Sequence, residues 1–309
     1  MRRTTTLGTL TALLALVAGF LLAPAPAQAG PARVTSWAPA ASATIHPGVQ
    51  MFTQGAQCTA NFVFSDGAGR VYVGYAAHCA GKGEATDTDG CDTASHPVGT
   101  RVRFAEGATL ATAGETVGHG TLAYSSWIAM RRDGGASANE CAANDFALVR
   151  VDAEDERKVN PSVPFWGGPT GLGDGATAGE EVYSYGQSSL RPTTVLSPKV
   201  GAVLARGYGG WGWDVYTATP GIPGDSGSGF LDARGRAFGT LSTIAIAPVA
   251  GSNGLGDLAR ELRYARDHSG IDGLRLVPGT KAFSPVPLTS GAGPGCCPAP
   301  VSGVSRLGC

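Results

Sequence analysis

Short apolar runs alternate with turn-forming residues along most of this chain. The segment 65–69, Ser-Asp-Gly-Ala-Gly, lies between the runs 58–64 and 70–75 and predicts a hairpin. The 47 Gly and 20 Pro exceed usual usage. Because they separate runs rich in Val, Phe, Tyr and Leu, they favour a turn-rich all-β fold over disorder. Further strands are predicted at 101–104, 146–151, 181–185, 213–217, 229–231 and 237–242.

One segment, 257–266, has the periodicity of a helix. Its apolar face consists of Leu258, Leu262 and Ala265. Asn253 or Gly254 suits a position near its start, and Gly270 suits its end. The last segment, 291–309, is rich in Gly, Pro and Cys and predicts a poorly ordered end.

The N-terminus has the layout of a secretory signal peptide. A basic start, Met1–Arg3, precedes the apolar run Leu7–Leu22, and an Ala-x-Ala site ends at Ala29. The alternative is an uncleaved membrane anchor, but the apolar run is shorter than the roughly 20 residues that a spanning helix needs. We therefore expect cleavage after Ala29 and a secreted, extracellular protein.

The segment after the predicted cleavage site is slightly acidic. Loss of Arg2 and Arg3 takes the 23 basic residues to 21, against 24 acidic ones, so the net charge is −3. That balance disfavours nucleic acid or an anionic membrane as a partner. Residues 30–309 are ordinary in number for two packed lobes, and the charged segment 152–161 is the expected link between them.

Seven cysteines in an exported chain suggest disulfides. The odd total leaves one thiol free or paired between chains, so a disulfide-linked dimer through the C-terminal cysteines stays open. We expect Cys58, Cys79, Cys91 and Cys141 to form disulfides; the pairing of Cys296, Cys297 and Cys309 is undetermined.

Ser226 is the candidate nucleophile. It lies in Gly221-Ile-Pro-Gly-Asp-Ser-Gly-Ser-Gly229, whose glycines allow a tight turn that a Cβ would not tolerate. Such a turn can aim the N–H groups of Gly224 and Ser226 at one point, where a carbonyl oxygen gains charge. The alternative for this segment alone is an ordinary Gly/Ser/Asp turn.

His78 and Asp145 are the candidate base and the residue that orients it. A histidine has a pKa near 6.5 and suits proton transfer at neutral pH. Asp145 directly precedes the apolar run 146–151, where a buried carboxylate needs hydrogen bonds. Taken alone, His78 could be a surface or hydrogen-bonded structural residue, and Asp145 a solvated carboxylate at a strand end. We keep the structural interpretation for the other histidines, which are His46, His96, His119 and His268.

Three segments together resemble the signatures of chymotrypsin-like serine peptidases. They are Ala-Ala-His78-Cys, Asp145-Phe-Ala-Leu-Val and Gly-Asp-Ser226-Gly, in that order along the chain. The segment 239–243 resembles the family strand whose backbone pairs with substrate, and Ser242 would lie near the pocket.

The resemblance implies two six-stranded antiparallel β-barrels and a C-terminal α-helix, with the catalytic triad between the barrels. The boundaries expected on this basis are 1–29 (signal), 30–45 (leader or short propeptide), 46–156 (first barrel), 157–275 (second barrel and helix) and 276–309 (tail).

The chain departs from the animal-type pattern in places. No Ile-Val-Gly-Gly-like segment follows a basic site, so Asp225 needs a partner other than a new N-terminus. Ser228 stands where members of the family often have a second Gly. Pro220, six residues before Ser226, gives no support to a pocket for Lys or Arg, and Ile244 would narrow the pocket toward small or medium apolar side chains. We therefore expect Ser242, Pro220 and Ile244 to contact substrate.

Two other functions compete with a serine endopeptidase. An α/β-hydrolase has the motif order Ser, acid, His and alternating β/α segments, which are missing here. A non-catalytic binding protein on a protease scaffold is the second alternative, since fold does not fix function. For the endopeptidase we expect a protein or peptide substrate, no cofactor and no metal, since no Cys/His cluster has zinc spacing.

Overall fold

The computed structural model describes residue 1 and residues 36–84, 87–244 and 249–285. All elements belong to the unit Pro31–Cys309. The strands are β1 (Gln50–Thr53), β2 (Ala56–Thr59), β3 (Val63–Ser65), β4 (Val71–Tyr75), β5 (Arg101–Glu106), β6 (Glu115–Ser125), β7 (Ala147–Val151), β8 (Glu181–Tyr185), β9 (Pro198–Gly207), β10 (Gly212–Thr217), β11 (Gly229–Leu231), β12 (Ala237–Ile244), β13 (Asn253–Asp257) and β14 (Arg275–Leu276). The α-helices are α1 (Ser126–Asp133), α2 (Ala138–Ala143) and α3 (Leu258–His268), and the 3-10 helices are η1 (Ala77–Ala80), η2 (Glu156–Lys158), η3 (Thr194–Leu196) and η4 (Tyr208–Gly210).

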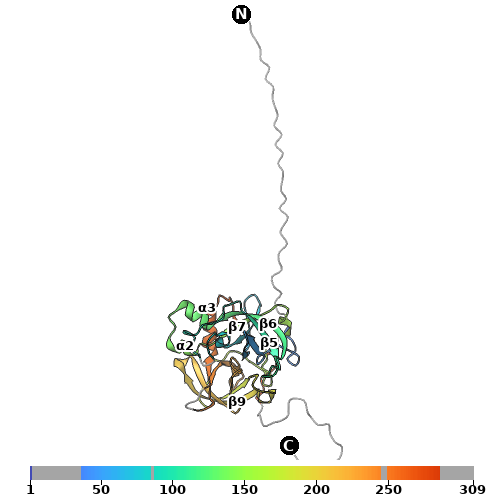
Figure 1. The fold of residues 1–309 in the computed structure, drawn as a ribbon, viewed down its shortest axis with the longest axis vertical. Helices are drawn as coiled ribbons and strands as arrows, with labels where there is room; N and C mark the ends of the chain where they lie inside the picture. Colours follow the sequence, from blue (N-terminus) through green and yellow to red (C-terminus); the bar gives the residue numbers. More distant parts are fainter. Residues whose placement is uncertain (2–35, 85–86, 245–248, 286–309) are drawn as a thin grey trace, which may run out of the picture. The chain divides into compact units, whose positions relative to one another are not determined.

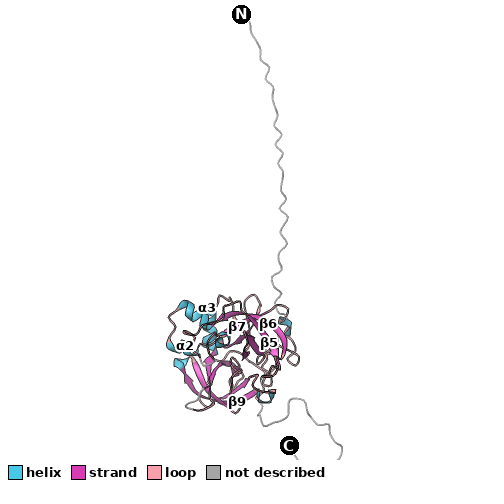
Figure 2. Ribbon diagram, in the orientation of Figure 1, coloured by secondary structure: helices cyan, strands magenta, loops and turns pink. Residues whose placement is uncertain are grey.

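The C-terminal half forms a closed six-stranded barrel. Its strand order is β10-β13-β12-β11-β8-β9, and every neighbouring pair is antiparallel. Its interior is filled by Val182, Val203, Trp213, Val215, Phe230, Phe238, Leu241 and Leu255. Figure 2 shows that strands predominate over helices in the described part of the chain.

The N-terminal half forms an eight-stranded sheet, which corrects the expectation of a second closed barrel. Its order is β14-β3-β4-β7-β6-β5-β1-β2; in Figure 1 the labels β5, β6 and β7 mark this sheet and β9 marks the barrel. The strands β2 and β3 lie toward opposite edges, although only residues 60–62 separate them in sequence. The Ala60 N–H donates to Val49 O, next to β1, whereas the Asn61 N–H donates to Gly74 O of β4, so the chain passes from the β1 side of the sheet to the β4 side within this link.

The predicted hairpin is confirmed for β3 and β4, where Val63 faces Val73. The antiparallel pairing throughout both sheets rules out the alternating β/α architecture of an α/β-hydrolase. A second apolar cluster contains Phe64 and Leu148 from the eight-stranded sheet, Leu231 from the barrel and Leu262 from α3. The two sheets therefore share a core.

The helix α3 begins one residue later and ends two residues later than the predicted 257–266. Asp257 caps it by accepting a hydrogen bond from the Arg260 N–H. The helices α1 and α2 were not predicted. A signal for α2 is present in the sequence, because Ser137 and Glu140 form a capping box in the structure.

Residues near both ends of the range 36–285 are bonded to the rest of the fold. In the predicted leader, the Ala38 N–H donates to Val159 O at 3.0 Å, and Ile45 is fully buried. β14 pairs with β3 through Leu276 and Phe64. The predicted signal peptide and the last three cysteines lie outside the described residues. Within the described ranges, the helices are too short or too polar to cross a bilayer.

Candidate active site

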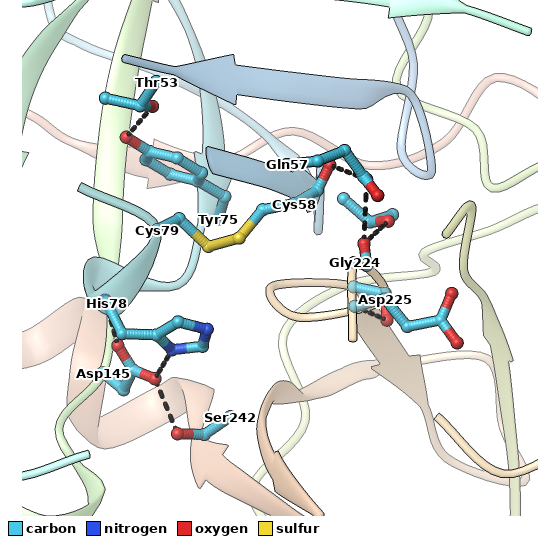
Figure 3. The surroundings of a disulfide bond; sticks show 12 residues. Thr53, Gln57, Cys58, Tyr75, His78, Cys79, Asp145, Gly224, Asp225 and Ser242 are labelled. Carbon is cyan, nitrogen blue, oxygen red and sulfur yellow. Dashed lines mark hydrogen bonds and ion pairs between the residues drawn. A yellow bond between two sulfur atoms is a disulfide. The ribbon is translucent and has the colours of Figure 1, made fainter. Parts of the chain in front are cut away.

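Strand register brings His78 and Asp145 together. His78 lies in η1 directly after β4, Asp145 lies just before β7, and Tyr75 of β4 faces Ala147 of β7. Asp145 Oδ2 is 2.6 Å from His78 Nδ1, and Oδ1 accepts the His78 backbone N–H at 2.8 Å. Ser242 Oγ donates to Asp145 Oδ2 at 2.6 Å, so three donors converge on one carboxylate (Figure 3).

These contacts set the charge states of the pair. Burial disfavours the Asp145 carboxylate, but the charge of His78 and the hydrogen bonds from His78 and Ser242 outweigh burial and lower the pKa of Asp145. Burial also lowers the pKa of His78, and Asp145 reverses that effect, so the net shift of the His78 pKa is upward. An ionised Asp145 holds the neutral ring's proton on Nδ1, which leaves Nε2 as an acceptor.

The disulfide Cys58–Cys79 fixes the turn that carries His78. It joins β2 to η1 across 21 residues, a separation for which the chain-entropy model gives about 3 kcal/mol of stabilisation. Figure 3 shows this bond above the His78 ring. The second disulfide, Cys91–Cys141, joins the segment after η1 to α2.

Ser226 lies in the loop between β10 and β11 and is held against the other sheet. The Thr59 N–H donates to Ser226 O at 2.8 Å. A Cβ on Gly227 would lie 2.8 Å from Ala76 N, two residues before His78. The loop is therefore packed against the chain that leads to His78. In the described part of the chain, no hydrogen bond joins Ser226 Oγ to His78, so that bond stays a prediction.

The N–H groups of this loop divide into two sets. Those of Ile222, Asp225, Gly227 and Ser228 all donate to protein acceptors. Within the residues that the structure describes, the N–H groups of Gly224 and Ser226 donate to none. These two were the predicted oxyanion donors. Ser228 has a structural role, because its hydroxyl donates to Asp225 O at 2.7 Å.

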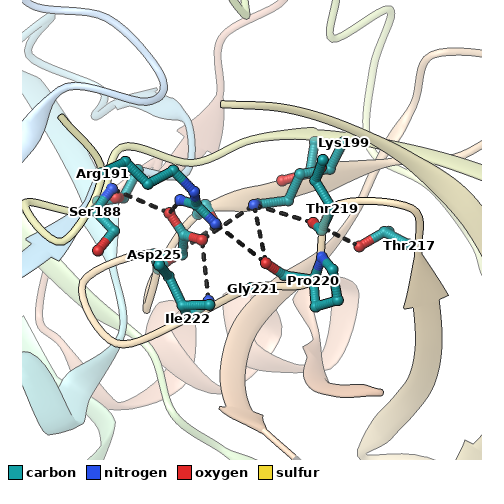
Figure 4. Close-up of polar contacts among 12 residues, drawn as sticks. Ser188, Arg191, Lys199, Thr217, Thr219, Pro220, Gly221, Ile222 and Asp225 are labelled. Carbon is teal, nitrogen blue, oxygen red and sulfur yellow. Dashed lines mark hydrogen bonds and ion pairs between the residues drawn. The ribbon is translucent and has the colours of Figure 1, made fainter. Parts of the chain in front are cut away.

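Two cations pair with the Asp225 carboxylate, which is fully buried. Arg191 Nη1 lies 2.6 Å from Oδ1, and Lys199 Nζ lies 3.0 Å from Oδ2 (Figure 4). Lys199 Nζ also donates to the carbonyls of Thr219 and Pro220. Burial lowers the pKa of Lys199, and the charge of Arg191 lowers it further, against the attraction of Asp225.

Nothing in the sequence near Asp225 indicates these two partners. Arg191 is 34 residues from Asp225, in the loop between β8 and β9. Lys199 is in β9, where a side chain with no exposed surface would ordinarily be apolar.

The residues expected to contact substrate have different surroundings. Ile244 ends β12 and is 45% exposed. The Pro220 carbonyl accepts from Arg191 and Lys199. The Ser242 hydroxyl is committed to Asp145. Asn253, which was expected near the start of the helix, lies instead in β13 and connects these segments, and Asp257 caps the helix.

Asn253 is fully buried at the start of β13. Its Oδ1 accepts the Gly221 N–H at 2.8 Å, and its Nδ2 lies 3.3 Å from both Gly221 O and Thr243 O. It therefore links the segment five residues before Ser226 to the residue after Ser242.

A residue that the sequence analysis missed, Glu261 of α3, lies behind Asp145 and is fully buried. Its Oε1 accepts the Asp145 N–H at 3.2 Å, and its Oε2 accepts from Thr240 Oγ1 at 2.9 Å. Burial raises the pKa of Glu261 well above its usual range, and the negative charge of Asp145 raises it further. A raised pKa shifts Glu261 toward its uncharged form, the form that does not repel the Asp145 carboxylate.

Two groups of side chains in the described ranges have the spacing of metal ligands. They are Cys58, His78 and Cys79, and Asp89, Cys91 and Cys141. All four cysteines are in disulfides, and a metal ligand is the thiolate, so the disulfides account for both groups.

Comparison with known protein families found no family model that matches, and no curated protein matches in sequence. Solved structures do match. Protease A of Thermobifida fusca is 19% identical with a TM-score of 0.45, covering 76% of this chain and 99% of that one. A Nocardiopsis protease is 19% identical with a TM-score of 0.44, covering 75% and 98%, and the chymotrypsin of Cellulomonas bogoriensis is 18% identical with a TM-score of 0.43, covering 76% and 98%. The chain is similar to bacterial serine proteases. At 18–19% identity, its own side chains must decide what it does.

Proposed function

We propose that the chain is a secreted serine endopeptidase that cleaves protein or peptide substrates through an acyl-enzyme. The observation that carries this proposal is the array of His78, Asp145 and Ser242. A buried carboxylate with three donors orients a histidine whose Nε2 is left as an acceptor, beside a loop that carries a serine. The two disulfides within the described residues fit an oxidising compartment, in keeping with the predicted signal peptide.

In the proposed mechanism, Ser226 Oγ attacks the carbonyl carbon of the scissile bond and His78 Nε2 takes the hydroxyl proton. Asp145 stays ionised and stabilises the imidazolium. His78 then gives the proton to the leaving amine, and the acyl group remains on Ser226. A water molecule repeats the sequence, with His78 as base, and releases the carboxylic acid. No cofactor takes part in these steps.

The N–H groups of Gly224 and Ser226 would stabilise the oxyanion that forms when Ser226 attacks. A donor aimed at developing charge is worth about 10²–10³ in kcat in enzymes of this mechanism. The hydrogen bonding of the loop supports this role, since its other N–H groups already have protein acceptors.

For the side chain before the scissile bond, we infer a preference for small apolar groups. Asn253 spans the space between Gly221 and Thr243, and within the described residues 220–244 the one carboxylate near Ser226, that of Asp225, is paired with Arg191 and Lys199. Ile244 is exposed at the end of β12 and would add an apolar wall. A peptide-library digest tests this preference; cleavage after Lys, Arg or Glu would contradict it.

A fluorophosphonate probe tests the activated serine directly. We expect the folded wild-type chain to label, and Ser226→Ala and His78→Ala to lose labelling, because one lacks the nucleophile and the other its base. The control is Ser42→Ala, an exposed serine far from the motif segments in sequence, which should label like the wild type. A disulfide-bonded wild type that never labels would overturn the enzyme and favour the binding-protein alternative.

A further inference from the structure

The loop that carries Ser226 is clamped from the other sheet by a glutamine. Gln57 in β2 directly precedes Cys58 of the disulfide. Its Oε1 accepts the Ser189 N–H at 2.9 Å. Its Nε2 lies 2.8 Å from Cys58 O, 3.0 Å from Gly224 O and 3.1 Å from Gln187 O. Figure 3 shows the Gln57 side chain reaching toward Gly224.

Two hydroxyl groups complete the clamp. Thr59 Oγ1 donates to Gly224 O at 2.8 Å and accepts the Gln187 N–H at 3.1 Å. Ser188 Oγ donates to Pro223 O at 2.5 Å and accepts the Leu190 N–H at 3.1 Å. Each hydroxyl therefore acts as donor and acceptor at once.

These bonds fix the peptide groups on both sides of Gly224. The Pro223 carbonyl is held by Ser188, and the Gly224 carbonyl is held by Gln57 and Thr59. Because a trans peptide is planar, holding Pro223 O on one side holds the Gly224 N–H on the opposite side. Gly224 has φ +94°, and a Cβ there would lie 2.2 Å from Gln57 Oε1. The backbone can pack this closely against Gln57 only because residue 224 is glycine.

We propose that Gln57 is a positioning residue for oxyanion stabilisation, with Ser188 as its partner on the adjoining peptide. The inference rests on the proposed function. Gln57 does not touch the substrate carbonyl; it holds the Gly224 carbonyl, on the peptide that follows Gly224, while Ser188 holds the Pro223 carbonyl, on the peptide that carries the Gly224 N–H. Together the two residues fix both peptides around the Gly224 Cα, and so the direction of the Gly224 N–H. The strand that carries Gln57 is also tied to the His78 turn. The same strand, β2, is therefore bonded both to the turn that carries the base and to the loop that carries the oxyanion donor.

The test compares Gln57→Met, which keeps the side-chain length and removes every hydrogen bond of the amide, with Gln54→Met. Gln54 lies in the exposed turn before β2 and makes no side-chain hydrogen bond among the described residues. We expect Gln57→Met to lower kcat about tenfold, less than the loss of a whole oxyanion donor, with KM within about twofold. A peptidyl aldehyde, whose adduct with Ser226 carries the oxyanion, should bind about tenfold more weakly. Gln54→Met should change neither.

A second variant, Ser188→Ala, separates positioning from general destabilisation. It should lower kcat and aldehyde affinity in the same direction while KM stays near the wild-type value. If either variant lowers the melting temperature but leaves kcat and aldehyde affinity unchanged, the residues only stabilise the fold and the inference is wrong. A wild-type chain that neither labels with the fluorophosphonate nor cleaves peptides overturns the proposed function as well.

Discussion

Asp145→Asn is expected to lower kcat about 10⁴-fold, the effect of the same change in chymotrypsin-like enzymes. In the wild type, Oδ1 accepts the His78 backbone N–H and Oδ2 faces His78 Nδ1 and Ser242 Oγ. An asparagine keeps its oxygen toward the backbone N–H, so its NH₂ group faces the ring. The ring must then accept at Nδ1 and carry its proton on Nε2, where it cannot take the Ser226 proton.

The pH profile of the residual activity distinguishes this mechanism from misfolding. In the proposed mechanism the wild type needs neutral His78, so we expect activity to fall as the pH drops through the His78 pKa, which Asp145 holds above the ordinary 6.5. Asp145→Asn removes that cause, so the acidic limb of kcat/KM should move to lower pH. The control is Asp155→Asn, because Asp155 is another buried aspartate that accepts from a backbone N–H and pairs with a cation, Lys158. A variant of Asp145 with kcat within tenfold of the wild type would contradict the orienting role.

The sequence indicates those parts of the fold and the site that depend on local patterns. The hairpin of β3 and β4 and the helix α3 follow from turn chemistry and apolar spacing. β6 was missed, although its buried positions alternate, because two of them are Gly118 and Gly120. A Cβ on Gly120 would lie 2.6 Å from Arg150 O, so close packing selects glycine and weakens the apolar pattern. β13 was missed for a similar reason: a Cβ on Gly256 would lie 2.0 Å from Glu261 Oε1.

The supporting residues of the site could not be predicted because their partners are distant in sequence. Gln57 and Gly224 are 167 residues apart, and Asp145 and Glu261 are 116 apart. A short motif identifies a serine, a histidine or an aspartate by its immediate neighbours. It does not identify the Gln57 amide or the buried Glu261 acid, which only the folded chain places next to the site. A closed N-terminal barrel was expected only from the family resemblance. The sequence of residues 60–62 does not indicate whether this sheet closes.

Asp225→Asn is expected to reduce the free energy of unfolding by about 3–5 kcal/mol, the usual effect of breaking a buried ion pair from one side. The change leaves Arg191 and Lys199 buried without a counterion. The new amide also places an NH₂ group where Oδ2 now accepts from Lys199 Nζ and the Ile222 N–H. Denaturant unfolding followed by fluorescence measures the loss. The control is Asp232→Asn, another fully buried aspartate, whose partner Arg236 is 23% exposed and also pairs with Asp174.

The pH dependence of that loss identifies Lys199 as its source. Burial and the charge of Arg191 lower the Lys199 pKa below 10.5, and Asp225→Asn removes the negative charge that opposes them. Between the lowered folded pKa and 10.5, the unfolded chain binds a proton that the folded chain does not, so the stability of Asp225→Asn should rise with pH. Adding Lys199→Met removes the titrating cation, so the double variant should regain stability and lose this slope. Two results would contradict this account. One is an equal loss of unfolding free energy in Asp225→Asn and Asp232→Asn; the other is an unchanged pH slope of stability in the double variant.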